Sequence, residues 1–171
     1  MSDVSVRNPF PPVIDGASRL LILGSMPSEA SRKADFYYMN PHNRFWRVMS
    51  AILGEDFLSM SREEKARALL SHDVALYDVV HHCMIKGSDD ASIRDVEPTD
   101  IESLLRKAPI ERILLNGKKA AALFKKFFPH CGVPTVVLPS TSPANAKCSL
   151  EDLTEAWKSA TVVPSHSDID S

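Results

Sequence analysis

Four short apolar runs, separated by segments of helical periodicity, constrain most strongly what this chain can fold into. The runs cover residues 20–23, 74–80, 112–115 and 135–138, and each ends near glycine, proline or polar residues. Runs of this length are typical of strands buried in a sheet. Strands that alternate with helices predict a parallel sheet with helices on both faces. We therefore expect an α/β fold, a three-layer αβα sandwich around a central, mostly parallel four-stranded sheet.

The segments between and after these runs show helical signals. The expected helices cover residues 45–52, 61–70, 98–105, 120–128 and 149–157. Gly54 is the stop signal of the first helix, and Ser61 opens the second with the pattern of a capping box. Residues 83–97 are rich in polar residues and are expected to form a long loop. These elements predict one domain over residues 1–160, followed by a disordered tail at 161–171.

The bulk composition allows a globular core and argues mildly against a nucleic-acid partner. The chain has 171 residues and a formal net charge of −2, whereas nucleic-acid-binding domains are usually basic. The stretch 106–126 departs from this balance, because it holds seven Lys and Arg residues and one acid, Glu111. This stretch is either a solvated helix face or a local binding surface for phosphate.

The sequence gives no sign of a metal, a cofactor or a membrane segment. Cys83, Cys131 and Cys148 lie far apart and form no CxxC pair, so we expect no disulfide and no zinc or iron–sulfur site. Such sparse cysteine usage favours a reducing cytoplasm. The N-terminus does not read as a signal peptide, and the apolar runs are too short to span a bilayer. The segment 24–28 lacks the spacing of dinucleotide and P-loop motifs.

Two polar, proline-bearing loops follow the first and the last of the apolar runs. The first begins Gly-Ser-Met-Pro-Ser at residues 24–28 and continues through three aromatics, 36–38, to Asn43. The second reads Pro-Ser-Thr-Ser-Pro over residues 139–143. In an open α/β sheet, ligands bind outside the carboxyl ends of the strands, so both loops are expected to face one site. Aromatics, a neutral amide and hydroxyls suit a flat, uncharged heterocycle.

Each candidate residue also has an ordinary structural interpretation. One of the three aromatics is expected to stack on a base, while the others fill the core. Asn43 is either an N-cap of the following helix or a ligand for water or an exocyclic oxygen. The second loop is either a stiff element that enters a groove or a plain surface turn. His81 and His82 are either candidate acids or uninvolved, and Asn40 has chemistry similar to that of Asn43.

Three stretches of the chain resemble the uracil-DNA glycosylase superfamily. Residues 38–48 read Tyr-Met-Asn-Pro-His-Asn-Arg-Phe-Trp-Arg-Val, which is similar to a segment of the mismatch-specific uracil-DNA glycosylases. Residues 138–145 resemble the second motif of the superfamily, its DNA-intercalating loop. The stretches 76–79, Leu-Tyr-Asp-Val, and 87–93, Gly-Ser-Asp-Asp-Ala-Ser-Ile, fit the hypoxanthine-DNA (deoxyinosine) glycosylase branch best. The resemblance covers about residues 15–160.

The resemblance implies a monofunctional DNA glycosylase, acting alone as a monomer, that removes hypoxanthine and uracil from DNA by base flipping and water attack. It implies a catalytic Asn43, a base pocket of Gly24, Ser25, Met26, Tyr38 and Phe45, and a DNA-binding loop of Pro139, Ser140, Thr141, Ser142 and Pro143. Met26 stands where better-known branches have Asp or Asn. Two alternatives remain: a uracil glycosylase specific for G/U mismatches, and a non-catalytic α/β domain that binds nucleic acid or a small molecule.

Overall fold

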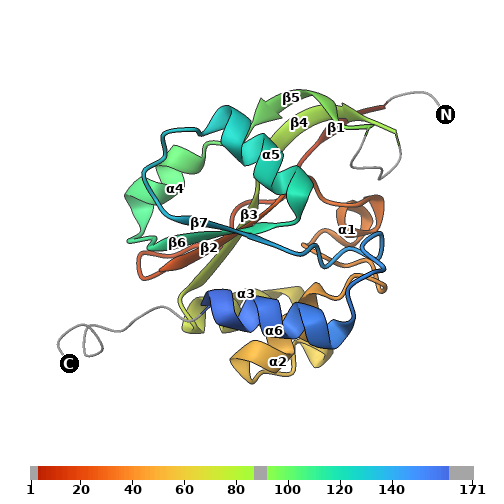
Figure 1. Cartoon of the computed structure of the whole chain (residues 1–171), viewed down its shortest axis with the longest axis vertical. Coiled ribbons are helices and arrows are strands. Elements are labelled where there is room, and N and C mark those ends of the chain that lie inside the picture. Colours follow the sequence, from red (N-terminus) through yellow and green to blue (C-terminus); the bar gives the residue numbers. More distant parts are fainter. Residues whose placement is uncertain (1–3, 87–91, 162–171) are drawn as a thin grey trace.

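The computed structural model describes residues 4–86 and 92–161, and its centre is a four-stranded parallel sheet. The strands are β2 (Leu20–Gly24), β3 (Val74–Asp78), β6 (Arg112–Asn116) and β7 (Thr135–Leu138). Their order is β3-β2-β6-β7, and every neighbouring pair is parallel. Helices lie on both sides of this sheet (Figure 1). The expected three-layer α/β sandwich is confirmed.

The alternation of side chains along β2 divides the interior into two apolar clusters. Leu20 and Ile22 point to one face, where they pack with residues of α2 (Phe45–Leu53), α3 (Arg62–Ser71) and α6 (Leu150–Thr161). Leu21 and Leu23 point to the other face, against α4 (Ile101–Lys107) and α5 (Lys118–Phe127). All five residues of β2 are buried, which is the expected property of a central strand covered on both faces.

A second sheet, which the sequence did not reveal, lies beside the first. It consists of β1 (Val4–Arg7), β4 (Val80–Ile85) and β5 (Arg94–Pro98) in the antiparallel order β1-β4-β5. The expectation of one strand over 74–80 is wrong, because the chain leaves the parallel sheet at Val79 and enters the second sheet. The expected loop over 83–97 is also wrong over the residues of β4 and β5.

These strands were missed for a physical reason. β1 and β5 are mostly exposed and carry charged residues, so they lack the apolar runs that mark buried strands. Their pairing with β4 holds them in place, and pairing leaves no local signal. Residues 87–91 of the stretch 87–93, and residues 162–171 of the expected tail, lie outside the described residues.

Several local signals predicted the helix ends correctly. Ser61 forms a complete capping box with Glu64 at the start of α3. Gly54 ends α2 in the left-handed conformation, with φ of 70°. Two short elements were not expected, α1 (Glu29–Ala34) and the 3₁₀ helix η1 (Phe57–Ser59). Among the described residues, no helix has the length and apolar character needed to cross a membrane.

Candidate active site

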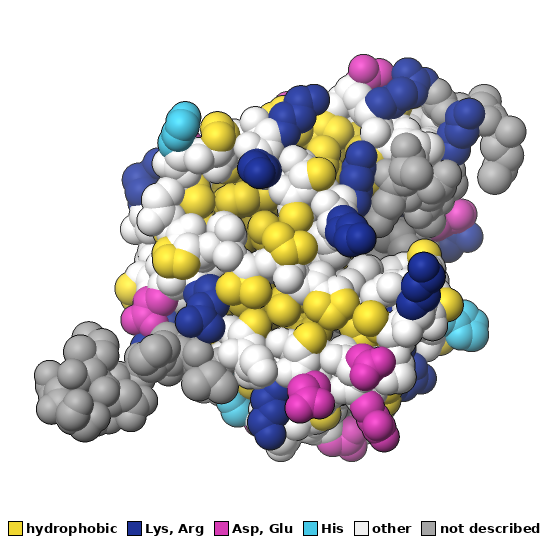
Figure 2. All heavy atoms as spheres, viewed as in Figure 1, with side chains coloured by type: hydrophobic (Ala, Val, Ile, Leu, Met, Phe, Trp, Pro, Cys, Tyr) yellow, Lys and Arg dark blue, Asp and Glu magenta, His cyan; other side chains and the backbone are white. Residues whose placement is uncertain are grey.

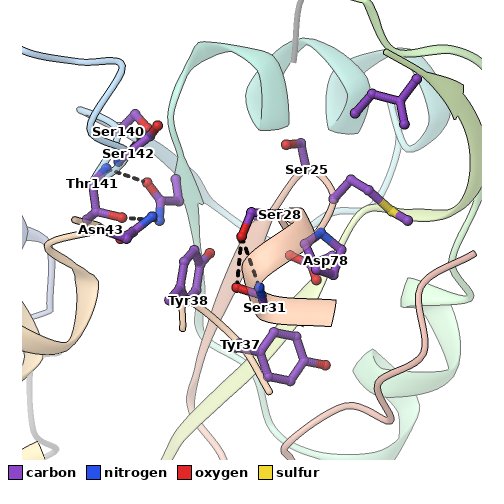
Figure 3. A pocket seen from close by; sticks show the side chains of 15 residues that line it. Ser25, Ser28, Ser31, Tyr37, Tyr38, Asn43, Asp78, Ser140, Thr141 and Ser142 are labelled. Atoms are coloured by element: carbon purple, nitrogen blue, oxygen red, sulfur yellow. Dashed lines mark hydrogen bonds between the residues drawn. The ribbon is translucent and has the colours of Figure 1, made fainter. Parts of the chain in front are cut away.

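A pocket opens at the carboxyl ends of β2, β3 and β6, between the two proline-bearing loops (Figure 3). It brings together eight of the residues that the sequence singled out: Gly24, Ser25, Met26, Tyr38, Asn43, Ser140, Thr141 and Ser142. Phe45, Pro139 and Pro143 are not among the lining residues. The two loops are separated by about a hundred positions in the chain, and the parallel sheet places them around one cavity.

Gly24 is required by the close approach of two side chains. A Cβ atom at this position would lie 2.6 Å from the Tyr38 hydroxyl and 2.6 Å from Oδ1 of Asp78. No side chain fits there without moving one of them. Gly24 therefore lets a tyrosine and a carboxylate meet at the floor of the pocket.

Tyr38 is held as a rigid aromatic wall. Its ring stacks on Phe45, with centroids 4.0 Å apart and planes 20° apart, and its backbone adopts a left-handed φ of 55°. Phe45 is fully buried, so the expectation that it lines the base pocket does not match its position. It lies behind Tyr38 and supports the ring, because it begins α2 and points into the core. A left-handed tyrosine is strained, and such strain is often found at functional sites.

The two aromatics before Tyr38 have structural partners. Tyr37 lines the pocket, and its hydroxyl donates to the carbonyl of Pro11 at 2.8 Å. Burial raises the pKa of Tyr37, with Asp78 the next contributor, so this phenol stays neutral. Phe36 lies in the apolar core and stacks on Trp46. Of the three aromatics, Tyr38 is the one held by both a stacking partner and a position at the pocket floor.

Asn43 supports the start of α2 and also lies at the pocket. Its Oδ1 accepts the backbone N–H of Phe45 at 2.9 Å, which supports the first turn of α2. The N-cap position itself is occupied by Arg44, so the prediction of Asn43 as N-cap is off by one residue. Asn43 also lines the pocket. The bond to Phe45 fixes the orientation of the amide and leaves one lone pair of Oδ1 and the NH₂ group for a ligand.

The polar groups of the second loop bond within the loop and to Asn116 at the end of β6. The buried Thr141 donates its N–H to Oδ1 of Asn116 at 3.1 Å, and Nδ2 of Asn116 donates to the Thr141 hydroxyl at 3.1 Å. The Ser140 hydroxyl accepts the N–H of Ser142, and the Ser142 hydroxyl accepts the N–H of Ala144. These bonds make the loop stiff, as the two prolines suggested.

Arg44 joins the two walls of the pocket. Its guanidinium donates to the carbonyls of Cys148, Ser142 at 3.1 Å and Asn145 at 2.9 Å, and its own N–H donates to the carbonyl of Thr141. Sequence reasoning gave Arg44 no role, although it lies inside the Asn-Arg-Phe-Trp stretch. Only the fold shows that this arginine holds the second loop against the start of α2.

Asp78 is a pocket residue to which sequence reasoning gave no role. It ends β3, is 3% exposed and lines the pocket, with Oδ1 facing Gly24. Its Oδ2 accepts from Nδ2 of Asn8 at 3.1 Å. Among the described residues, Asp78 is the one Asp or Glu that lines the pocket, and no Lys, Arg or His lines it. Such a pocket does not suit a phosphate, but a carboxylate can accept a hydrogen bond from the N–H of a base.

The remaining polar candidates lie away from the pocket. His82 pairs with the Ser5 hydroxyl at 2.6 Å, and His81 lies 3.4 Å from the guanidinium of Arg7, both across the β1–β4 pair. Asn40 accepts the N–H of His42 in a turn.

Met26 lines the pocket and packs into an apolar cluster, so it contributes an apolar wall. In the described part of the chain, no group of three or more His, Cys, Asp or Glu could hold a metal.

The comparisons with known proteins agree with this geometry. The family model of the uracil DNA glycosylase superfamily matches residues 11–161. The chain belongs to this superfamily. A hypoxanthine DNA glycosylase from Methanosarcina barkeri is 36% identical to it over 152 residues, which cover 88% of this chain and 95% of the relative. A hypoxanthine DNA glycosylase from Methanosarcina acetivorans is 37% identical over 145 residues, covering 84% and 91%.

A solved structure supports the fold of this superfamily member. The solution NMR structure of a candidate uracil DNA glycosylase from Methanosarcina acetivorans matches with a TM-score of 0.80 and 34% identity. The match covers 92% of this chain and 97% of that one. The family match and this structure confirm the resemblance to the superfamily, and the two Methanosarcina relatives confirm that it is greatest to the hypoxanthine branch.

Proposed function

We propose that this superfamily member is a monofunctional glycosylase that excises deaminated bases from DNA, hypoxanthine first and uracil second. Its family and the names of its relatives support a DNA glycosylase. One observation carries the base preference: a flat aromatic wall, Tyr38, meets a buried carboxylate, Asp78, at the pocket floor. The first suits stacking on a base, and the second suits an N–H donor on its edge.

The carboxylate gives a reason for choosing deaminated bases. Deamination of adenine converts N1 from an acceptor into an N–H donor, and the same change occurs at N3 when cytosine becomes uracil. An ionised Asp78 accepts a hydrogen bond from such an N–H and repels the lone pair of the undamaged base. Because Asp78 is buried, an unpaired lone pair facing this carboxylate costs more than it would in water. Both hypoxanthine and uracil carry the required donor, and the larger ring of hypoxanthine gains more stacking on Tyr38.

The chemistry needs a water molecule and stabilisation of charge. Cleavage of the N-glycosidic bond builds positive character on the sugar and negative charge on the departing base. Asn43 would orient the attacking water with the free lone pair of Oδ1, because its other lone pair is held by Phe45. Backbone N–H groups near Gly24 and Ser25 would stabilise the charge of the leaving base, as in an oxyanion hole. A neutral amide is a weak catalyst, which favours good leaving groups.

The proposed product is an intact strand with an abasic site. A strand-cutting step would require an amine nucleophile, and no lysine of the described segments lines the pocket. The flipped nucleotide would be held by the stiff loop at Ser140–Ser142 on one side, while Lys118 and Lys119 begin α5 next to it. Basic side chains gather over the part of the surface that holds α5, and a group of acidic ones lies near α6, whose first turn holds Glu151 and Asp152 (Figure 2). This separation reconciles a net charge of −2 with a DNA substrate.

A panel of labelled oligonucleotides tests the proposal. Each carries one hypoxanthine, uracil, xanthine or adenine, and abasic sites are revealed by alkali after incubation with the protein. We expect the fastest cleavage at hypoxanthine, slower cleavage at uracil and no cleavage at adenine. Activity confined to uracil opposite guanine would replace this proposal with a mismatch-specific uracil glycosylase. No cleavage of any substrate by folded protein would favour a non-catalytic binding domain.

A further inference from the structure

A buried amide from the N-terminal segment contacts the floor of the pocket from behind. Asn8 follows β1, is 6% exposed, and precedes residue 11, where the match to the family model begins. β1 pairs with β4 up to Arg7 and His82, which brings Asn8 beside the last residue of β3 and the first residue of β4. The carboxylate that we assign to base recognition therefore has a partner outside the family match.

The hydrogen bonds of Asn8 fix its amide in one orientation. Nδ2 donates to Oδ2 of Asp78 at 3.1 Å and to the carbonyl of Val80 at 3.3 Å. Oδ1 accepts the N–H of Phe10 at 3.0 Å, and the backbone N–H of Asn8 donates to the carbonyl of His81 at 2.7 Å. Exchanging the oxygen and nitrogen of the amide would lose all three side-chain bonds. The sequence places a neutral donor behind the carboxylate, where a Lys or Arg would cancel its charge.

The two oxygens of Asp78 consequently lie in different surroundings. Oδ2 accepts from Asn8, while Oδ1 lies against Gly24, which also lines the pocket. We propose that Asn8 is a positioning residue for base recognition, which holds the Asp78 carboxylate with Oδ1 directed at the N–H of the flipped base. This inference rests on the proposed function, because it names how that site obtains its preference for deaminated bases. Donation from Asn8 also favours the ionised form of the carboxylate.

Exchange of Asn8 for aspartate tests this role most sharply. Asn8→Asp has the same shape, but it replaces the donor that faces Asp78 with a second acceptor. At pH 8 two carboxylates then oppose each other, and we expect single-turnover excision of hypoxanthine to fall by about tenfold or more. At about pH 5.5 one proton can be shared between the two carboxylates, and the rate relative to the natural protein should recover. Asn8→Ala should show the loss without the recovery in acid.

Other titratable groups around Asp78 must be separated from this effect. Tyr37 and Tyr77 have pKa values raised mainly by burial, so they stay neutral in this pH range. Tyr38 meets Asp78 at Gly24, and His81, His82 and Arg7 lie on the β1–β4 pair. These groups are unchanged in the variants, so each rate is divided by that of the natural protein at the same pH. Ser5→Ala is the matched control, because it removes a contact of β1 with His82 and does not touch Asp78.

Binding to DNA that lacks a base distinguishes positioning from folding. A duplex with a stable abasic analogue occupies the DNA-binding surface of the protein but places no base in the pocket. The Kd for this duplex should therefore change by less than about twofold in both Asn8 variants. Weaker binding together with a lower Tm, in proportion to the lost activity, would make Asn8 a purely structural residue and overturn the inference. Rates equal to the natural protein at both pH values would also overturn it. If the natural protein excises no base at all, the proposed function fails first, and the inference fails with it.

Discussion

The two walls of the pocket contain similar residue types and use them differently. On the first wall, the segment from Gly24 to Asn43, together with Asp78, directs an aromatic ring, an amide and a carboxylate at the cavity. On the second wall, the hydroxyls of Ser140 and Ser142 bond to backbone groups of the same loop. In the proposed function, the first wall supplies the chemistry and the second supplies a stiff shape.

This difference determines how each wall should respond to mutation. Losing a group that faces the ligand changes the transition state, whereas losing a group bonded within a loop changes loop stability and DNA binding. Arg44 lies between the walls, so its loss should affect both. We expect the effect of mutation to decrease from the first wall, through the junction at Arg44, to the second wall.

The largest effect is expected at Asn43. Asn43→Ala should slow base release by about 10²-fold or more, since one positioned polar group is worth a few kcal/mol at a transition state. It should also lower the free energy of unfolding by about 1 kcal/mol, because the bond to the N–H of Phe45 is lost. Single-turnover rate and Tm are measured on the same preparation.

Asn43→Asp provides the matched control for this prediction. An aspartate keeps the acceptor for the Phe45 N–H and can still orient water, so it should retain most of the stability and far more activity than alanine. If Asn43→Ala turns over at a nearly normal rate and shows only the stability loss, Asn43 serves the start of α2 and not the reaction.

An intermediate effect is expected at Arg44, the junction of the two walls. Arg44→Ala removes the donors to three carbonyls, one in the second loop and two in the segment after it, and should lower the free energy of unfolding by roughly 2 kcal/mol. Excision should fall by about tenfold, because Asn43 and the loop lose their common support. Urea unfolding and single-turnover kinetics measure the two effects. A stability loss with unchanged excision would mean that the walls act independently.

The smallest effect is expected on the second wall. Ser142→Glu should weaken binding of duplex DNA several-fold through repulsion from phosphate, and Ser142→Ala, which loses one bond to Ala144, should change it less. Affinity of the natural protein should fall as salt rises, because phosphate contacts release counterions. Flipping is cheaper from a single strand than from a matched pair, so the loss of activity should be greatest on a well-paired duplex. Equal losses on single and double strands would show that this loop does not assist flipping.

Much of the fold followed from local patterns in the sequence. β2, β3 and β6 were recognised because burial on both faces requires continuous apolar runs, and β7 was recognised by its apolar run although it is a partly exposed edge strand. The capping box of α3 and the glycine at the end of α2 were recognised because a few adjacent residues form these structures. The second sheet was not, because β1 and β5 are partly exposed and are held by strands distant in the chain.

The sequence by itself determined which two loops would surround the site, and the tertiary structure decided which of their residues face it and what completes it. Parallel strands that end in polar loops must bring those loops to one edge, so Tyr38, Asn43 and the loop at Ser140–Ser142 could be placed together without coordinates. Whether an aromatic at the start of α2 lines the pocket or supports Tyr38 depends on packing, and Phe45 is buried. The pairing of Asn8 with Asp78 joins residues 70 positions apart. A hydrogen bond of that range leaves no periodicity and no local motif, because it exists only after both sheets have formed.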